Sequence, residues 1–421
     1  MPDYDVIVVG ARCAGASLAM LLARAGRRVL AIDRARFPSD TLSTHFLWPR
    51  TTAFLASWGL LEALAATGCP PIETVRIHFG SATVAGRPEP VDGTDVMYCP
   101  RRTVLDALLV EAARRAGAEV REGTTMRAVL RDGDRVVGVR AVGPDGEAYE
   151  ARATMVVGAD GMMSGVADAV QAPLERSHPS LTCGFYAYWR DLPTDGVEFY
   201  LRDGRDVLVF PTHDDLTCLW VGKSSSDWPA YKKAVEASYL GALDASLLVR
   251  VRAAERATRF KGTHRLPNHY RTCWGDGWAL VGDAAYHRDP LTGMGIGDAF
   301  LGAQLLADAL DAGLSGNRTG DLAAALAGYQ QALWDRTASV FDYTLQSAAL
   351  KDPAPLAPLY AEIARRPEMT QRLMNVLGGT APARSLFNVR TMMQLAGARP
   401  RGRKPPPAPA PGDGGPPGHT T

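Results

Sequence analysis

Apolar residues in the first third of the chain fall into short continuous runs. Residues 6–9 and 29–32 are such runs, and an apolar helical stretch at 14–24 lies between them. Unbroken runs of this length are typical of parallel strands covered on both faces. An amphipathic helix at 103–116 is followed by residues 118–121, where we expect a third parallel strand. The pattern predicts a parallel sheet with helices packed against it.

Alternation of apolar and polar residues takes over further along. Residues 136–140 and 149–154 flank a Pro-Asp-Gly turn and predict a hairpin, and a separate buried strand is expected at 155–158. Short polar turns then join four alternating segments, which predict an antiparallel sheet forming a second, inserted domain. Strands from residues 71–99 are expected to join it. The four segments are 181–189, 197–201, 206–210 and 216–221.

The last part of the chain reads as helices over residues 322–395, followed by a tail rich in proline and glycine. Such a tail buries too little apolar surface to fold, so we expect disorder there. A short apolar helix at 14–24 does not suffice for a membrane span, and no leader segment precedes the first strand. We therefore expect a cytoplasmic protein with no membrane span.

Composition narrows the function classes. The 421 residues carry a net charge of +1, so no overall field recruits nucleic acid. Six cysteines are scattered without any Cys-x-x-Cys pair, which fits neither a zinc site nor a disulfide framework. We expect buried thiols and no bound metal.

The first chemistry-bearing motif follows the first strand. Gly10 and Gly15 match the outer glycines of Gly-x-Gly-x-x-Gly, while Arg12 stands at the middle position. Glycines here allow a tight turn and close packing of helix on strand, with a pyrophosphate at the helix N-terminus. Asp33 ends the second strand, where an acid accepts the ribose hydroxyls of an adenosine. The spacing predicts a dinucleotide site.

A second anion site is predicted almost three hundred residues later. A strand at 278–281 leads through Gly282 and Asp283 to a glycine-rich turn at 293–297, and a helix follows at 298–310. Free backbone N–H groups and the positive end of the helix dipole suit an anion. Between the two sites lies the Asp160-Gly161 turn, which by itself could merely end a strand.

Together these three segments resemble the FAD-dependent monooxygenase family typified by p-hydroxybenzoate hydroxylase, related to geranylgeranyl reductases and flavin-dependent halogenases. The resemblance spans roughly residues 4–310 and implies that both distant sites hold one FAD molecule. It implies an α/β fold with a Rossmann-type FAD-binding domain, an inserted antiparallel β-sheet substrate domain and C-terminal helices. The implied FAD-binding residues are Gly10, Arg12, Ala14, Gly15, Asp33, Arg34, Arg102, Asp160, Gly161, Gly282, Asp283, Pro290, Gly293, Gly295 and Ile296.

Seven segments follow from this reading. The FAD-binding domain comprises 1–70, 100–175 and 266–320; the substrate domain comprises strands from 71–99 and the antiparallel sheet of 176–265; C-terminal helices occupy 321–398 and the disordered tail 399–421.

Some positions depart from the family pattern. Tyr286 replaces the usual histidine, which comes one place later as His287, and Gly297 closes the glycine-rich turn. Arg102 resembles the arginine that faces the pyrophosphate, although the adjacent Arg101 competes with it by proximity.

Catalytic candidates come from two places. His45 lies in a polar loop after Asp33, and in relatives this loop passes near the flavin. That His45 has only a structural role is an equally weighted alternative. The inserted sheet offers Tyr188 and His213, besides Tyr186 and Trp220, although alternating aromatic residues in a sheet more often form a core.

The resemblance implies a monooxygenase that uses FAD, NADPH or NADH, and O₂ to hydroxylate or epoxidise a small aromatic or polyketide-like molecule through a flavin C4a-hydroperoxide. The absence of a second glycine-rich nucleotide motif argues against a two-Rossmann disulfide reductase. No Trp-x-Trp-x-Ile-Pro signature supports a halogenase. Two alternatives stay open: a reductase of the geranylgeranyl type acting on C=C bonds, and a flavin-binding partner without catalysis. A homodimer also stays open.

Overall fold

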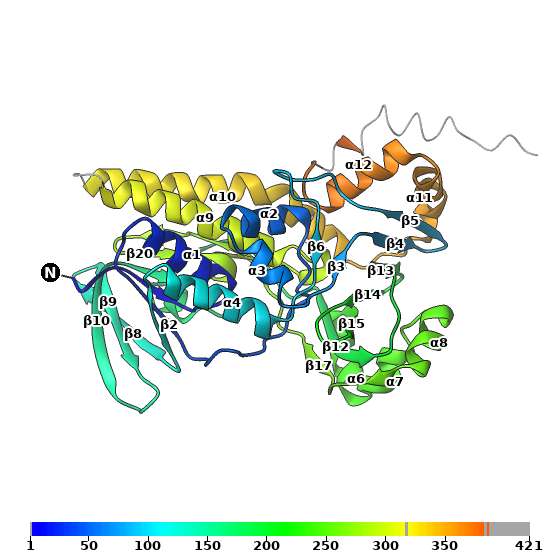
Figure 1. Ribbon diagram of the computed structural model, residues 1–421, viewed down its shortest axis with the longest axis horizontal. Helices are drawn as coiled ribbons and strands as arrows, with labels where there is room; N and C mark the ends of the chain where they lie inside the picture. Colours follow the sequence, from blue (N-terminus) through cyan, green and yellow to red (C-terminus); the bar gives the residue numbers. More distant parts are fainter. Residues whose placement is uncertain (1, 316–318, 383–384, 387–421) are drawn as a thin grey trace, which may run out of the picture.

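A computed structural model describes residues 2–315, 319–382 and 385–386 (Figure 1). The predicted tail at 399–421 and the end of the predicted C-terminal helical region lie outside these residues. Within the described residues, no helix is long and apolar enough to cross a membrane.

A parallel sheet forms the centre of the larger lobe. Residues 6–9 of its first strand are almost completely buried, as the continuous apolar run predicts. The strand order is β19-β20-β10-β1-β2-β7, in which β20, β10, β1, β2 and β7 run parallel and β19 is antiparallel. The strands are β1 (Tyr4–Val9), β2 (Val29–Asp33), β7 (Glu119–Glu122), β10 (Ala148–Gly158), β19 (Trp274–Gly275) and β20 (Trp278–Leu280).

The hairpin beside this sheet differs from the prediction in one respect. The segments expected at 149–154 and 155–158 form one strand, β10. Its first half pairs antiparallel with β9 (Arg135–Val142), which pairs with β8 (Thr125–Asp132), and its second half pairs parallel with β1. A strand can change partners without a break, so the local pattern does not mark where pairing changes.

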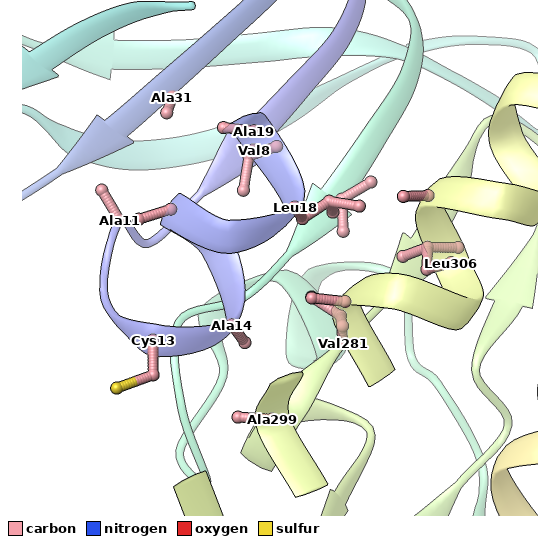
Figure 2. Close-up of a cluster of buried hydrophobic side chains, with 14 of the residues drawn as sticks. Val8, Ala11, Cys13, Ala14, Leu18, Ala19, Ala31, Val281, Ala299 and Leu306 are labelled. Atoms are coloured by element: carbon pink, nitrogen blue, oxygen red, sulfur yellow. The ribbon is translucent and has the colours of Figure 1, made fainter. Parts of the chain in front are cut away.

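Helices pack against the parallel sheet. In Figure 2, Leu18 points toward the later helix that carries Ala299 and Leu306, and Val8, Leu18 and Leu306 belong to one buried cluster. Many of these side chains are alanine, so backbones approach closely at native density. The helices are α1 (Cys13–Arg24), α2 (Pro49–Ser57), α3 (Leu61–Ala65), α4 (Arg102–Arg115), α5 (Gly165–Ala169), α9 (Gly295–Ser315) and α10 (Thr319–Ser347); α9 and α10 lie side by side along the top in Figure 1.

The second sheet has the order β16-β12-β15-β14-β13-β4-β5, with β17 also paired to β12. It is antiparallel except that β4 lies parallel to β13, a pairing between segments about 120 residues apart that alternation alone does not specify. The strands are β4 (Val75–Phe79), β5 (Ala82–Gly86), β12 (Thr182–Arg190), β13 (Val197–Arg202), β14 (Arg205–Pro211), β15 (Leu216–Ser224), β16 (Glu255–Arg256) and β17 (Lys261–Thr263).

Alternating residues place two different cores on the two faces of this sheet. One face packs on short helices through Tyr231 and Tyr239, and the other face belongs to a cluster with Phe46 and Met294 from the larger lobe. We call the second one the inner face; it carries Tyr186, Tyr188, Phe210 and Trp220. The short helices are α6 (Trp228–Lys233), α7 (Val235–Leu240) and α8 (Ala245–Ala253), and α11 (Ala357–Ala364) and α12 (Pro367–Leu377) pack beside β5.

Small elements complete the fold. Strands β11 (Leu174–His178), β18 (Asn268–Arg271) and β21 (Tyr286–His287) make a three-stranded sheet, and β3 (Pro71–Ile72) pairs with β6 (Met97–Tyr98). Single 3₁₀ turns occur at η1 (Ser225–Asp227), η2 (Gly282–Ala284), η3 (Pro290–Thr292) and η4 (Ala354–Leu356).

We expect Gly10→Ala to lower the free energy of unfolding by more than about 2 kcal/mol, measured by urea unfolding. Gly10 has φ of +101°, and a Cβ there would come within 2.4 Å of the Ala159 carbonyl oxygen. Left-handed backbone alone costs about 1–2 kcal/mol with a side chain. Gly26→Ala is the matched control, since Gly26 has φ of +80° and nothing within 4 Å. Equal losses in the two variants would contradict the close approach.

Candidate functional site

One cavity of about 610 Å³ gathers the three sequence motifs. Because β20, β10, β1 and β2 are parallel neighbours, their carboxyl ends lie at one edge of the sheet. Ligands of open α/β sheets bind at such an edge. The predicted cofactor residues that line the cavity are Gly10, Arg12, Ala14, Asp33, Arg34, Arg102, Asp160, Gly161, Gly282, Asp283, Pro290, Gly293, Gly295 and Ile296.

Gly15 has a different place. Among the described residues that line the cavity it is absent. A Cβ at Gly15 would come within 1.8 Å of the Gly10 carbonyl oxygen, so glycine lets α1 begin directly against the turn. Gly15 thus shapes the site through packing.

The carboxylate of Asp33 is held by the backbone. Its Oδ2 accepts a hydrogen bond from Ala11 N at 2.8 Å, and its Oδ1 accepts one from Ala35 N at 2.7 Å. A carboxylate has about four acceptor positions. The remaining lone pairs of this fixed group suit the hydroxyls of a ribose.

Arg12 stands at the position of the missing middle glycine, and its guanidinium group points toward Asp106 and Ser39. Its Nη1 lies 2.5 Å from Asp106 Oδ2 and it also donates to Ser39. The fully buried Asp106 accepts two further hydrogen bonds from Arg102, at 2.9 and 3.1 Å. Two guanidinium groups therefore share one carboxylate, which leaves positive charge beside the cavity.

Arg101 and Arg102 are neighbours in the chain but lie in different surroundings. Arg102 lines the cavity. Arg101 directly precedes α4, forms an ion pair with Asp214 at 3.1 Å and lies over the Tyr188 ring, outside the described cavity lining. The geometry favours Arg102 as the arginine that faces an anion.

Asp160 stabilises its own turn. Its carboxylate accepts hydrogen bonds from Ser164 Oγ at 2.5 Å and from Val166 N at 3.2 Å, at the start of α5. Burial raises the pKa of this carboxyl, and these hydrogen bonds counter part of the rise. The adjoining Gly161 lines the cavity with φ of +87°.

The glycine-rich turn brings the start of α9 to the cavity. Gly293 has φ of +63°, and nothing lies within 4 Å of the Cβ position of Gly295, which borders the cavity. Gly297 meets Thr51, whose Oγ1 would lie 2.5 Å from an added Cβ. The first N–H groups of α9 have no partner within the helix, so this end presents positive charge.

Tyr286 and His287, where the chain departs from the family pattern, are both held by specific contacts. Tyr286 stacks on Tyr270 with ring centroids 4.6 Å apart, and His287 Nδ1 is hydrogen-bonded to the Pro267 carbonyl. Both line the cavity. His269 makes a hydrogen bond to the Asp283 carbonyl at 3.1 Å, which fixes the backbone of that residue.

His45 lies at the cavity and is almost completely buried. Its Nε2 is 2.9 Å from Tyr188 Oη, and its φ of +29° is unusual for a residue with a side chain. Burial, reinforced by Arg102, lowers the pKa of the imidazole to about 3. Burial raises the pKa of the Tyr188 phenol. Both groups are therefore neutral near pH 7.

Tyr188 and His213 do not belong to the cavity lining in the described part of the chain. Tyr188 reaches the cavity only through His45. His213 hydrogen-bonds Thr67 at 2.8 Å and accepts from Arg101 N at 3.2 Å, and burial lowers its pKa. A catalytic role for His213 stays a prediction that this geometry does not favour.

Sequence reasoning missed two buried acids. Asp206 is 1% exposed on the inner face, and burial together with Asp289 raises the pKa of its carboxyl to about 7. Asp289 accepts a hydrogen bond from Thr182 Oγ1 at 2.5 Å, which links the loop before η3 to β12. An acid at an inward position of an alternating strand was the available signal for Asp206.

Comparison with known proteins agrees with this geometry. Residues 3–332 match the family described as "FAD binding domain". The chain is 28% identical over 322 residues to the digeranylgeranylglycerophospholipid reductase of Methanosarcina acetivorans, covering 73% of this chain and 74% of the relative. It is 27% identical over 311 residues to the 6-methylpretetramide 4-monooxygenase of Streptomyces rimosus, covering 69% and 71%. The structure of the myxobacterial chondrochloren halogenase shares the fold, with a TM-score of 0.74, 24% identity and coverage of 93% and 95%.

We expect the free energy of unfolding, measured with urea, to fall between pH 5 and pH 8 in the natural protein. The fall should be about 2–3 kcal/mol larger than in Asp206→Asn. The raised pKa means that the folded state holds this proton up to about pH 7 while the unfolded chain releases it near the ordinary value of 3.8. The unfolded state thus binds fewer protons in this window, and stability decreases as pH rises, at about 1.4 kcal/mol per pH unit.

Asp203→Asn, at an exposed turn position, controls for the loss of a carboxylate. Parallel pH profiles for the natural protein and Asp206→Asn would show that the Asp206 carboxyl is not held protonated.

Proposed function

The chain belongs to the FAD binding domain family, and on that premise we propose that it is an NAD(P)H-dependent FAD monooxygenase of a small aromatic or polyketide-like molecule. NADPH or NADH as donor, O₂ as co-substrate and a cytoplasmic location belong to the same proposal. The observation that carries it is a single cavity that runs from the nucleotide-type turns to the inner face of the second sheet.

The residues fit FAD. Gly161 and Gly295 line the cavity, and nothing lies within 4 Å of the Cβ position of either one, so the space beside them is open to a bound group. Asp33 would take the adenosine ribose, and Arg102 with the N-terminus of α9 would balance anionic charge. Asp283 would hold the ribityl chain.

Bound FAD would accept hydride from NAD(P)H and deliver one atom of O₂ to an electron-rich carbon, the second atom leaving as water. The protein has to exclude water, orient the substrate and manage protons. His45 is neutral at the cavity, and Tyr188 fixes the imidazole through a 2.9 Å hydrogen bond. We assign His45 a hydrogen bond to a substrate hydroxyl and Tyr188 the positioning of His45.

A reductase that saturates C=C bonds is the second candidate, supported by the likeness to the Methanosarcina acetivorans reductase and by the apolar inner face. The two reactions differ in their need for oxygen. The likeness to the chondrochloren halogenase, at 24% identity, concerns the fold alone.

We expect ¹⁸O from ¹⁸O₂ in the product when FAD-loaded protein turns over hydroxylated aromatic probes with NADPH or NADH, measured by mass spectrometry. Parallel anaerobic reactions with an isoprenoid alcohol test the second candidate. A product that gains two hydrogens without oxygen would favour the reductase and contradict oxygen transfer. Absence of NAD(P)H oxidation with every probe would favour the non-catalytic alternative.

We expect Asp283→Ala to weaken FAD binding by about ten- to a hundredfold, since a hydrogen bond to a charged group contributes about 1.5–3 kcal/mol. FAD retained after gel filtration and a fluorescence titration measure the loss. Asp308→Ala, at an exposed position on α9, is the matched control. Equal retention in both variants would refute the role of Asp283.

A further inference from the structure

The register of the inner face brings an acid and two glycines into one row. Asp206 of β14 lies opposite Gly222 of β15, which lies opposite Gly184 of β12. The next row is Leu208, Trp220 and Tyr186, on the same face because side chains alternate along a strand. Trp220 therefore stands beside a row that contains two positions without side chains.

The indole of Trp220 fills the space over these glycines. A Cβ on Gly184 would lie 2.3 Å from Cζ2 and 2.5 Å from Cη2 of the indole. A Cβ on Gly222 would lie 2.9 Å from the indole Nε1. The ring lies against the bare backbone of β12 and β15, a place that side chains would close.

Asp206 fixes the orientation of the ring. The indole Nε1 donates a hydrogen bond to Asp206 Oδ2 at 3.2 Å. The carboxyl itself also lies over Gly222, where a Cβ would come within 2.0 Å of Oδ1. Burying a carboxyl is costly, and a purely apolar core would not need this hydrogen bond to hold an indole. We therefore regard Asp206 as the anchor of Trp220.

Trp220 is also the inner-face aromatic that reaches the cavity. Within the described ranges, Tyr186 and Tyr188 do not line it, whereas Trp220 does, together with His45, Pro290 and Gly293. Trp220 is 3% exposed, so its indole is held in place by packing. It lines the cavity where the cavity meets the sheet of the predicted substrate domain.

We propose that Trp220, seated on Gly184 and Gly222 and anchored by Asp206, is the specificity-determining residue of this site and selects planar aromatic substrates by the number of fused rings. This rests on the proposed function. The indole offers a flat π surface and edge for contact with an aromatic ring, and its fixed position limits the length of the ring system. Asp206 acts through Trp220 and is a positioning residue.

The experiment measures binding to the oxidised, FAD-loaded protein by equilibrium dialysis and by perturbation of the flavin spectrum. Its probes are phenol, 2-naphthol and 2-anthrol, which have one, two and three rings. We expect Trp220→Ala to weaken binding of the probe that the natural protein binds best by about tenfold, since loss of an aromatic contact costs about one factor of ten in affinity. The preference should also shift toward a larger ring system. Asp206→Ala should weaken that binding a few-fold, and Asp206→Asn, which keeps an acceptor, should restore it.

Trp189→Phe is the control, because Trp189 lies on the opposite face of the same sheet, where its indole contacts the Tyr239 hydroxyl. An unchanged rank order of the three probes in Trp220→Ala would overturn the proposal. Should that variant not fold, Trp220→Phe and Asp206→Ala decide, and unchanged binding in both would overturn it equally.

Failure of the proposed function gives a different result. Selective binding that depends on Trp220, without ¹⁸O transfer, refutes the monooxygenase and supports the specificity role. Oxygen transfer with unchanged probe preference in the variants refutes the specificity role alone.

Discussion

The close approach of two turns at the edge of the parallel sheet is the constraint on which the rest depends. The turn after β1 passes so near the turn after β10 that a Cβ at Gly10 would lie 2.4 Å from the Ala159 carbonyl oxygen. Helix α1 starts so near the same turn that a Cβ at Gly15 would lie 1.8 Å from the Gly10 carbonyl oxygen. Two glycines thus set the distance between the motifs, and the cavity lies where they meet.

Buried charge around the cavity follows one arrangement twice. Asp106 is shared by Arg12 and Arg102, and Asp298 is shared by Arg50 and Arg288. Each group leaves one positive charge uncompensated by its carboxylate. Isolated buried charge is costly, so two such groups beside one cavity are suited to a ligand that carries negative charge.

The two lobes meet through specific polar contacts. His45 reaches Tyr188, Asp289 reaches Thr182, and Asp40 forms an ion pair with Lys261. Each contact joins a loop near the cavity to β12 or to β17, which pairs with β12. These contacts hold the inner face against the loops beside the cavity, so the shape of the cavity depends on both the parallel-sheet lobe and the second sheet.

The sequence by itself determined the parallel strands, the glycine turns and the family, because apolar runs and glycines at tight turns are local properties of the chain. Fourteen of the residues that the sequence assigned to a cofactor line one cavity, since parallel strands bring their carboxyl ends together, and their contact with FAD stays a prediction. Only the tertiary structure decided that β10 is one strand, that β4 pairs with β13, and that Arg12 turns to Asp106. It also separated Arg102 from Arg101, moved His213 outside the lining, and brought Asp206 to Trp220. These outcomes depend on contacts between residues far apart in the chain, and no local pattern of residues specifies which distant side chain fills the space beside them.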